Sequence, residues 1–376
     1  MDISQSIDNI RTLEVQVMKK WIAIGILSVL VIGMVMMSGC TSPSPAAVHM
    51  TPVTAGPTTP TVSGDWKFVV FADSPDPAEN TTTGVSPALI PIAQAIAAEK
   101  PDLALYMGDL VNGWELTNAS PMAGNYTGQF ENWVKYVTPI HNYTEGTGIP
   151  LYVIRGNHED GQNQTVAPLL NSYLATAAAG MPANGPPGEK KLTYSFTHKG
   201  AKFVMNDNYI EHNGLKETVN QSWVTGQLTL DTRPFMFVFG HSPAYAVVLD
   251  DTKENGYSID IHPLLRDILW KSMVDNNVSA YFCGHAHLYV RGERQGVLQI
   301  VSGNAGAHAL AFDPVNVDPA LTLISPKKTI AKDDQRVGYL VFTVHESTGT
   351  VDGIEKQLNP ATNEWENVDT FTIRAR

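Results

Sequence analysis

The sequence predicts an α/β fold built on parallel strands, and two observations lead to that prediction. From Trp66 onward, short apolar runs alternate with stretches that have the period of an amphipathic helix. Polar residues follow the apolar runs directly, as they do where the carboxyl ends of parallel strands carry a site. With 376 residues, of which 43% are hydrophobic, the chain can bury a full core, so disorder throughout is excluded.

The first half of this region has a strand, helix, strand rhythm. The apolar runs at 66–72, 103–107 and 150–154 predict buried strands, and the amphipathic stretch at 86–99 predicts a helix. This order implies parallel strands joined by right-handed crossovers.

The second half continues with strands and one further helix. We expect a strand pair at 192–196 and 202–206, a helix near 261–275, and strands at 235–239, 278–283, 298–302, 338–345, 351–357 and 369–373. No internal repeat is present. Two long loops, 113–129 and 161–190, are expected to wall the pocket and to set specificity.

Charge and cysteine content exclude several classes of protein. The formal net charge is −12, which argues against a surface that coats a nucleic acid backbone. The two cysteines, Cys40 and Cys283, cannot form a disulfide framework or a thiolate zinc cluster. Any bound metal must therefore use His, Asp or Asn, and Cys283 is expected to pack as a small apolar residue.

The N-terminal residues 1–40 are predicted to be an extension with a targeting signal or membrane anchor. Lys19 and Lys20 precede an apolar run at 21–37, which Ser38, Gly39 and Cys40 close. This ending resembles a lipoprotein box, in which Cys40 would be lipidated; an uncleaved spanning helix and ordinary cleaved secretion are the alternatives. All three place the rest of the chain outside the cytoplasm, because the lysines stay inside.

Two further parts follow this signal. Residues 41–62 are rich in Ser, Thr and Pro and lack bulky apolar side chains, so they are expected to form an extended linker. Residues 63–376 are expected to form the catalytic domain, with β-strands at its C-terminal end.

Five predicted strand ends carry residues that can bind a divalent metal. These candidates are Asp73, Asp109, Asn157, His241, His285 and His287. Carboxylate, amide and imidazole groups are suitable ligands without any cysteine. Two cations about 3.5–4 Å apart can share a carboxylate and clamp a phosphoryl oxygen for in-line attack.

At these residues the chain resembles the calcineurin-like metallophosphoesterases, a family that includes the purple acid phosphatases. The matching motifs, in the family's order, are FADSP around Asp73, GDLVN at 108–112, GNHE at 156–159, GHSPAY at 240–245 and GHAH at 284–287. The resemblance implies a four-layer α/β/β/α sandwich and hydrolysis of phosphate esters by two divalent metal ions.

The resemblance also implies a role for each candidate. It puts Asp73 and His287 on one metal, Asn157, His241 and His285 on the other, and Asp109 between them. His158 would be a catalytic imidazole that binds no metal and that protonates or stabilises the leaving oxygen.

Two positions depart from the family's pattern. Many members have a histidine where this chain has Pro75, so the first metal keeps three clear protein ligands, and Asn112 or water is a candidate for another. Asn112 also replaces the tyrosine of purple acid phosphatases, so a purple ferric site is not expected and Mn²⁺, Fe²⁺ or Zn²⁺ is favoured. Where other members have an aspartate at this position, the Asn112 amide is expected to orient His158 by a hydrogen bond.

Further side chains near the motifs are candidates for contact with substrate. Arg155 and Arg291 flank motifs and would either contact phosphate or form structural ion pairs. His308, in the sequence GNAGAH, follows a predicted strand end and is a candidate for reaching the substrate.

Together these features predict a monomeric phosphoesterase tethered to the cell membrane, with its catalytic domain on the extracytoplasmic side. Its partners would be a phosphate ester and the membrane, and whether it takes monoesters or diesters stays open. A nucleotide or cyclic nucleotide phosphodiesterase on the same scaffold is one alternative. A degenerate surface protein that binds metal without turnover is another.

Overall fold

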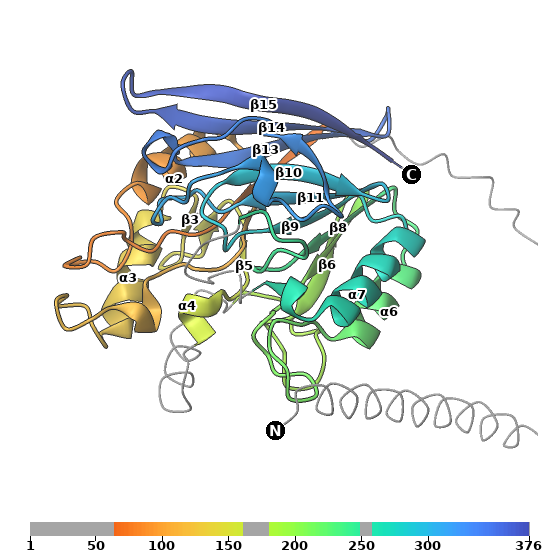
Figure 1. Cartoon of the computed structure of the whole chain (residues 1–376), viewed down its shortest axis with the longest axis horizontal. Coiled ribbons are helices and arrows are strands. Elements are labelled where there is room, and N and C mark those ends of the chain that lie inside the picture. The colour runs from red at the N-terminus through yellow and green to blue at the C-terminus, as the bar shows by residue number, and fades with distance from the viewer. Residues whose placement is uncertain (1–63, 161–179, 249–257, 376) are drawn as a thin grey trace, which may run out of the picture. The chain divides into compact units, whose positions relative to one another are not determined.

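Two mixed β-sheets lie at the centre of the fold (Figure 1). The computed structural model describes residues 64–160, 180–248 and 258–375, all within a unit that spans Thr61–Arg376. The predicted signal, anchor and linker at 1–62, including Cys40, lie outside the described residues. So does most of the predicted loop 161–190.

The first sheet has the strand order β15-β14-β13-β1-β2-β5. Its parallel part consists of β1 (Trp66–Phe71), β2 (Leu103–Tyr106) and β5 (Leu151–Val153). The antiparallel strands β13 (Gly338–His345), β14 (Thr350–Asn359) and β15 (Glu364–Arg374) extend it beyond β1. The predicted parallel pairing of the first three strands is confirmed.

The second sheet has the order β12-β10-β11-β9-β8-β7-β6. Its strands are β6 (Tyr194–His198), β7 (Ala201–Met205), β8 (Phe235–Phe239), β9 (Ala280–Cys283), β10 (Tyr289–Arg294), β11 (Val297–Ser302) and β12 (Thr322–Ser325). The neighbours β7, β8, β9 and β11 are parallel, and the outer strands are antiparallel. A separate short pair joins β3 (His141–Asn142) and β4 (Thr147–Gly148).

Helices cover the outer faces of the two sheets (Figure 1). Helices α2 (Leu89–Glu99) and α3 (Tyr126–Tyr136) lie on one side, and α6 (Gln221–Thr229) and α7 (Pro263–Asp275) on the other. Short helical turns are α4 (Asn157–Asp160), η1 (Gly113–Glu115), η3 (Ile259–Ile261), η4 (Pro314–Asn316) and η5 (Lys332–Asp334). This arrangement confirms the predicted α/β/β/α layers.

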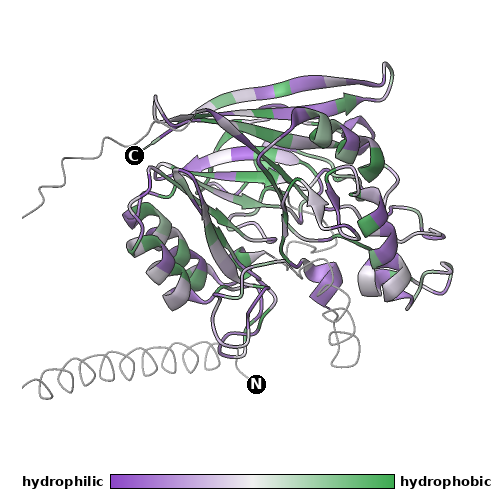
Figure 2. Ribbon diagram, turned by 180° about the vertical axis from the view of Figure 1, so that it is seen from behind, coloured by the Kyte–Doolittle hydropathy of each residue, from purple (hydrophilic) through white to green (hydrophobic). Residues whose placement is uncertain are grey.

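Aromatic side chains fill the space between the two sheets. Phe68 of β1 stacks on Phe342 of β13, with ring centroids 4.6 Å apart, and lies 5.2 Å from Phe237 of the second sheet. A second cluster joins the other face of that sheet to α6 and α7, and includes Tyr281 and Trp270. Figure 2 shows the hydrophobic colour concentrated on the inner strands, while β14 and β15 carry many hydrophilic residues.

The structure also contains elements that the sequence patterns did not predict. Helix α3 begins inside the predicted loop 113–129, where the Asn125 side chain caps it by accepting a hydrogen bond from the Gly128 N–H. Strand β10 carries Arg291 and Glu293, which interrupt the apolar run expected of a buried strand. Among the residues described, no helix is both long and apolar enough to cross a membrane.

Candidate metal centre

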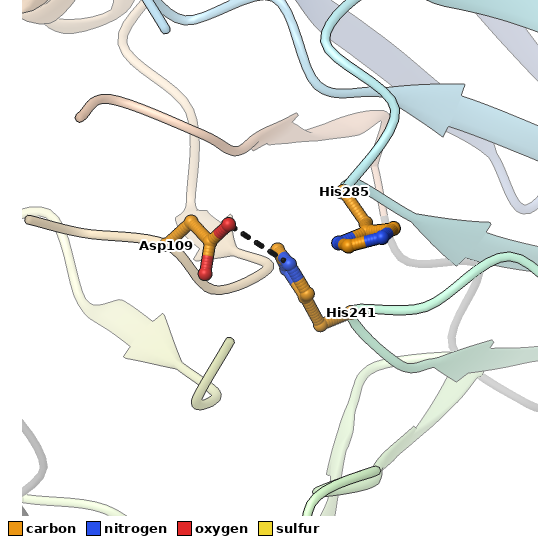
Figure 3. A group of neighbouring side chains, drawn as sticks. All are labelled: Asp109, His241 and His285. Atoms are coloured by element: carbon orange, nitrogen blue, oxygen red, sulfur yellow. Dashed lines mark ion pairs between the residues drawn. The ribbon is translucent and has the colours of Figure 1, made fainter. Parts of the chain in front are cut away.

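The predicted ligands lie at strand ends of both sheets and come together at one place. Asp73 lies two residues beyond the end of β1, Asp109 follows β2 after a short turn, and Asn157 opens α4 just beyond β5. His241 follows β8 and His285 follows β9. Figure 3 shows Asp109, His241 and His285 pointing toward one another from three separate segments.

Three of these residues have a left-handed backbone. The φ angles are 66° at Asp73, 53° at Asp109 and 65° at His285. Residues other than glycine rarely adopt this left-handed region. Such conformations cluster at functional sites, where the surrounding structure holds them in place. At Gly156 a Cβ atom would overlap Asp109 Oδ1, so the loop beside Asp109 requires glycine.

One cluster of ligand atoms is formed by Asp109, His241 and His285, whose atoms all lie within 4.8 Å of one another. His241 Nε2 is 3.1 Å from Asp109 Oδ2. Asn157 joins the cluster, because its Oδ1 lies 3.0 Å from His241 Nε2 and 2.9 Å from His285 Nδ1.

The second cluster consists of Asp73, Asp109 and His287, with the same spacing limit of 4.8 Å. His287 Nε2 is 3.6 Å from Asp73 Oδ1. Asp109 belongs to both clusters, so the structure groups these residues as the family resemblance implies. That they bind metal stays a prediction.

The chemistry of these clusters fits a pair of divalent cations. Asp109 Oδ2 is buried and accepts no hydrogen bond, its near neighbour being His241 Nε2 at 3.1 Å, and such an oxygen is costly unless a cation or a donor satisfies it. Burial, together with the neighbouring charge of Asp109, raises the pKa of Asp73 well above its usual range. A cation between the two carboxylates would relieve this repulsion.

Two of the histidines, His285 and His287, have the protonation state that a metal requires. Burial lowers the pKa of His285 to about 3 and that of His287 to about 4, so both imidazoles are neutral near pH 7. His241 Nδ1 lies 2.7 Å from Met107 O, and His287 Nδ1 lies 2.7 Å from His308 O. These carbonyls accept the Nδ1 proton and leave Nε2 of each ring to face the cluster.

His308 therefore contributes through its backbone. Its carbonyl orients His287, while its ring contacts Lys332 Nζ.

Glu159 organises the site, and our interpretation of the sequence assigned it no role. Its buried carboxylate accepts hydrogen bonds from the backbone N–H groups of Asp109, Leu110, Val111 and Gly156 at 2.8–3.2 Å. It thereby joins the loops that carry two predicted ligands. Its place directly after His158 in the GNHE motif is the sequence signal that points to it.

His158 lies beside the clusters, with its ring buried. Its Nδ1 is 2.9 Å from Asn112 O, and its Nε2 is 3.7 Å from Asp109 Oδ2 and 3.4 Å from Glu115 Oε2. Burial alone would lower the pKa of His158, but the charges of Asp109 and Glu115 raise it to about 9. A protonated Nε2 in this place has the geometry of a proton donor.

The expectation that the Asn112 side chain orients His158 is wrong, and its part as a further metal ligand stays a prediction. Its Oδ1 accepts from the Asp76 N–H at 2.9 Å, and its Nδ2 donates to Asp76 O at 3.1 Å. Both ends of the amide are therefore engaged with this loop, and the hydrogen bond that orients His158 does not come from the side chain. The backbone carbonyl of Asn112 accepts the hydrogen bond from His158 instead.

Arg155 and Arg291 both form structural ion pairs, which is one of the two predicted alternatives. Arg155 is buried, with Nε 2.8 Å from Asp207 Oδ2 and Nη1 3.3 Å from Asp160 Oδ1. Arg291 contacts both carboxylate oxygens of Asp369 through Nη2, at 2.9 and 3.1 Å.

A cavity of about 130 Å³ opens beside the two clusters. Its described lining consists of Asp109, Glu115, Asn157, His158, Pro243, Ala246, Val247, Val248, Ser258, His285, Ala286, His287 and Leu310. The lining therefore combines polar residues, including His158, with apolar ones. A phosphate ester placed here would have its phosphoryl group at the ligand clusters.

A sequence model of the family described as calcineurin-like phosphoesterase matches residues 64–289, more than half of the chain. This chain belongs to the calcineurin-like phosphoesterase family. Members of the family are hydrolases that act on phosphoric ester bonds, and they use divalent metals. A search of curated protein sequences gives no match.

Solved structures show the same fold. The purple acid phosphatase PPD1 from yellow lupin (Lupinus luteus) seeds aligns with a TM-score of 0.59 and 18% identity, over 83% of this chain and 54% of that one. PhoD aligns with a TM-score of 0.58 and 12% identity, over 83% and 70%. GAP50, described as the anchor in the inner membrane complex of Plasmodium, gives 0.50 and 14%, over 84% and 90%.

The chain spans about half the length of the lupin phosphatase. At these identities the likeness shows the fold alone, and the chemistry depends on the residues of the site.

Proposed function

We propose that this chain hydrolyses phosphate esters with two divalent cations, Mn²⁺, Fe²⁺ or Zn²⁺, held by the six residues of the two clusters. The observation that supports this most directly is Asp109, whose buried carboxylate belongs to both clusters and has an oxygen without a hydrogen-bond partner. A carboxylate shared in this way is what two adjacent cations need.

When bound, the cations would act as Lewis acids on the phosphoryl oxygens and would activate the attacking water. The protein's own groups do the rest. The carbonyls of Met107 and His308 orient His241 and His287. Asn112 O accepts the Nδ1 proton of His158, so that Nε2 faces the cavity and can give its proton to the leaving oxygen.

Asp109→Asn tests the proposal, because it removes the shared charge without changing the size of the side chain. We expect hydrolysis of p-nitrophenyl phosphate and bis-p-nitrophenyl phosphate to fall at least 10³-fold, an order-of-magnitude expectation for loss of a metal-bridging group. The full chain is stripped with a chelator, reloaded with each metal in turn, and assayed together with its metal content.

Asp275→Asn is the matched control, because Asp275 pairs with Lys271 on the surface of α7. Wild-type turnover by Asp109→Asn would contradict a two-metal mechanism. A wild-type protein that holds one ion and never turns over would support the degenerate alternative.

We also propose that the enzyme acts outside the cytoplasm, tethered to the membrane through Cys40. The order of Lys19 and Lys20, the apolar run 21–37 and Ser38-Gly39-Cys40 in the sequence supports this. Cys40→Ser should release the protein from the membrane fraction if Cys40 carries the lipid. Retention of the variant would favour an uncleaved helix.

A further inference from the structure

The cavity beside the metal centre has an unusual balance of charge. Beyond the predicted ligands and His158, its described lining contains one charged side chain, Glu115, and no lysine or arginine. A pocket that receives a dianionic group commonly supplies cationic donors such as arginine. Here the described lining places a carboxylate there instead.

The structure fixes the backbone that carries Glu115, whose side chain is 42% exposed. Glu115 ends the short helix η1, which begins at Gly113 with φ of 57°, and a Cβ atom there would overlap the His158 carbonyl. Trp114 Nε1 donates to Asn157 O at 2.9 Å, which fixes η1 against the loop of a predicted ligand. As a result, Glu115 Oε2 lies 3.4 Å from His158 Nε2, on the side where the leaving group would be.

Much of the remaining cavity lining is apolar. Pro243, Val247, Val248 and Leu310 line it, and they can contact an uncharged ester group but cannot pair with an anionic one. A substrate in this cavity would therefore meet the predicted metal ligands, apolar carbon and the carboxylate of Glu115.

We propose, on the basis of the proposed function, that Glu115 is a specificity residue. It selects phosphodiesters that carry a single negative charge and whose ester groups are uncharged. It does so by repelling phosphomonoester dianions and alcohols that carry a further phosphate or carboxylate. Like charges within a few ångströms repel, with solvent screening at a side chain as exposed as Glu115, and such repulsion gives specificity by disfavouring the wrong substrate.

The test compares two substrates that share a leaving group and differ in charge. At pH 8, p-nitrophenyl phenylphosphonate carries one negative charge and p-nitrophenyl phosphate carries two. The ratio of their kcat/KM values is measured for the metal-loaded full chain and its variants. We expect Glu115→Gln to shift the ratio toward the dianion by about tenfold, and Glu115→Lys to shift it further, because the effect follows charge.

Glu131→Gln is the matched control, since it removes the same charge from an exposed position of α3 away from the cavity. We expect the control to keep the wild-type ratio. The proposal would be overturned if Glu115→Gln and Glu115→Lys both had wild-type metal content and left the ratio of kcat/KM values unchanged.

A second readout does not depend on turnover. Phenylphosphonate and its monomethyl ester differ by one charge, and calorimetry measures their affinity for the metal-loaded protein. Glu115→Gln should tighten binding of the dianionic phenylphosphonate alone, and equal tightening of both would overturn the role of charge. If the wild type hydrolyses neither p-nitrophenyl substrate with any metal, the proposed function itself fails, whereas hydrolysis with an unmoved ratio removes Glu115 alone.

Discussion

At the scale of single residues, the site depends on side chains that hydrogen bonds to the protein already hold in place. The imidazoles of His241 and His287 are oriented by backbone carbonyls, and the loops around Asp109 are joined by Glu159. Each bond removes rotational freedom, so the groups that face the cavity are positioned before a substrate arrives. His158 follows the same rule through Asn112 O.

We predict that His158→Ala slows substrates with poor leaving groups more than those with good ones. A leaving alkoxide needs a proton in the transition state, and a nitrophenolate does not, so the loss should be roughly 10²–10⁴-fold for an alkyl ester and much smaller for the nitrophenyl ester. The measurement is the dependence of kcat/KM on leaving-group pKa. His262→Ala, at a histidine outside the cavity lining, serves as the control; equal losses across the series would remove His158 from the acid role.

At the scale of elements, strand β14 carries a buried acidic side chain that is distant in sequence from the predicted metal ligands. Glu355 is fully buried, and Asn304 and Gln357 donate to its Oε1, while its Oε2 has no hydrogen-bond partner. Acidic and phenolic groups interact with its charge from both sheets, namely Asp369 on β15, Tyr339 on β13 and Tyr289 on β10 of the second sheet. Burial is the main cause that raises its pKa, from 4.5 to about 8.

We predict that this carboxyl makes the protein less stable as the pH rises from about 4.5 to about 8. In that window the folded chain keeps the proton and the unfolded chain releases it, so unfolding becomes more favourable with rising pH. The contribution is on the order of a few kcal/mol. Free energies of unfolding of wild type and Glu355→Gln between pH 5 and pH 9 test it, because the variant should lose this slope; identical slopes would refute the prediction.

At the scale of the whole molecule, the two sheets must pack together before the site exists. Asp73, Asp109 and Asn157 come from the first sheet, and the histidines come from the second. The aromatic layer around Phe68, Phe342 and Phe237 joins these sheets. The stability of that layer and the geometry of the metal centre are therefore linked.

We predict that Phe68→Ala lowers the free energy of unfolding by about 3–5 kcal/mol, the usual cost of deleting a fully buried phenylalanine. Urea unfolding measures it. Leu230→Ala, at a side chain that is 86% exposed, is the control and should change stability by no more than about 0.5 kcal/mol. A cost below 1 kcal/mol for Phe68→Ala would show that the inter-sheet layer repacks.

Much of this fold was predictable because its signals are local. The apolar run of β8 matches its predicted bounds Phe235–Phe239, and β13 matches Gly338–His345. Strand β10 was missed because Arg291 and Glu293 break its apolar pattern, and Arg291 is accommodated through Asp369, which is distant in sequence. Local periodicity cannot report a partner of that kind.

The sequence by itself determined the family, the layered α/β fold and the six residues that the structure brings into two clusters, because motifs and strand ends are local in the chain. The tertiary structure decided which contacts the residues around these six side chains make. Only in the folded protein does the Asn112 side chain turn out to be engaged by Asp76, and only there does Glu115 lie at His158. The physical reason is that charge and hydrogen bonding depend on distance in space, and packing of the two sheets sets those distances.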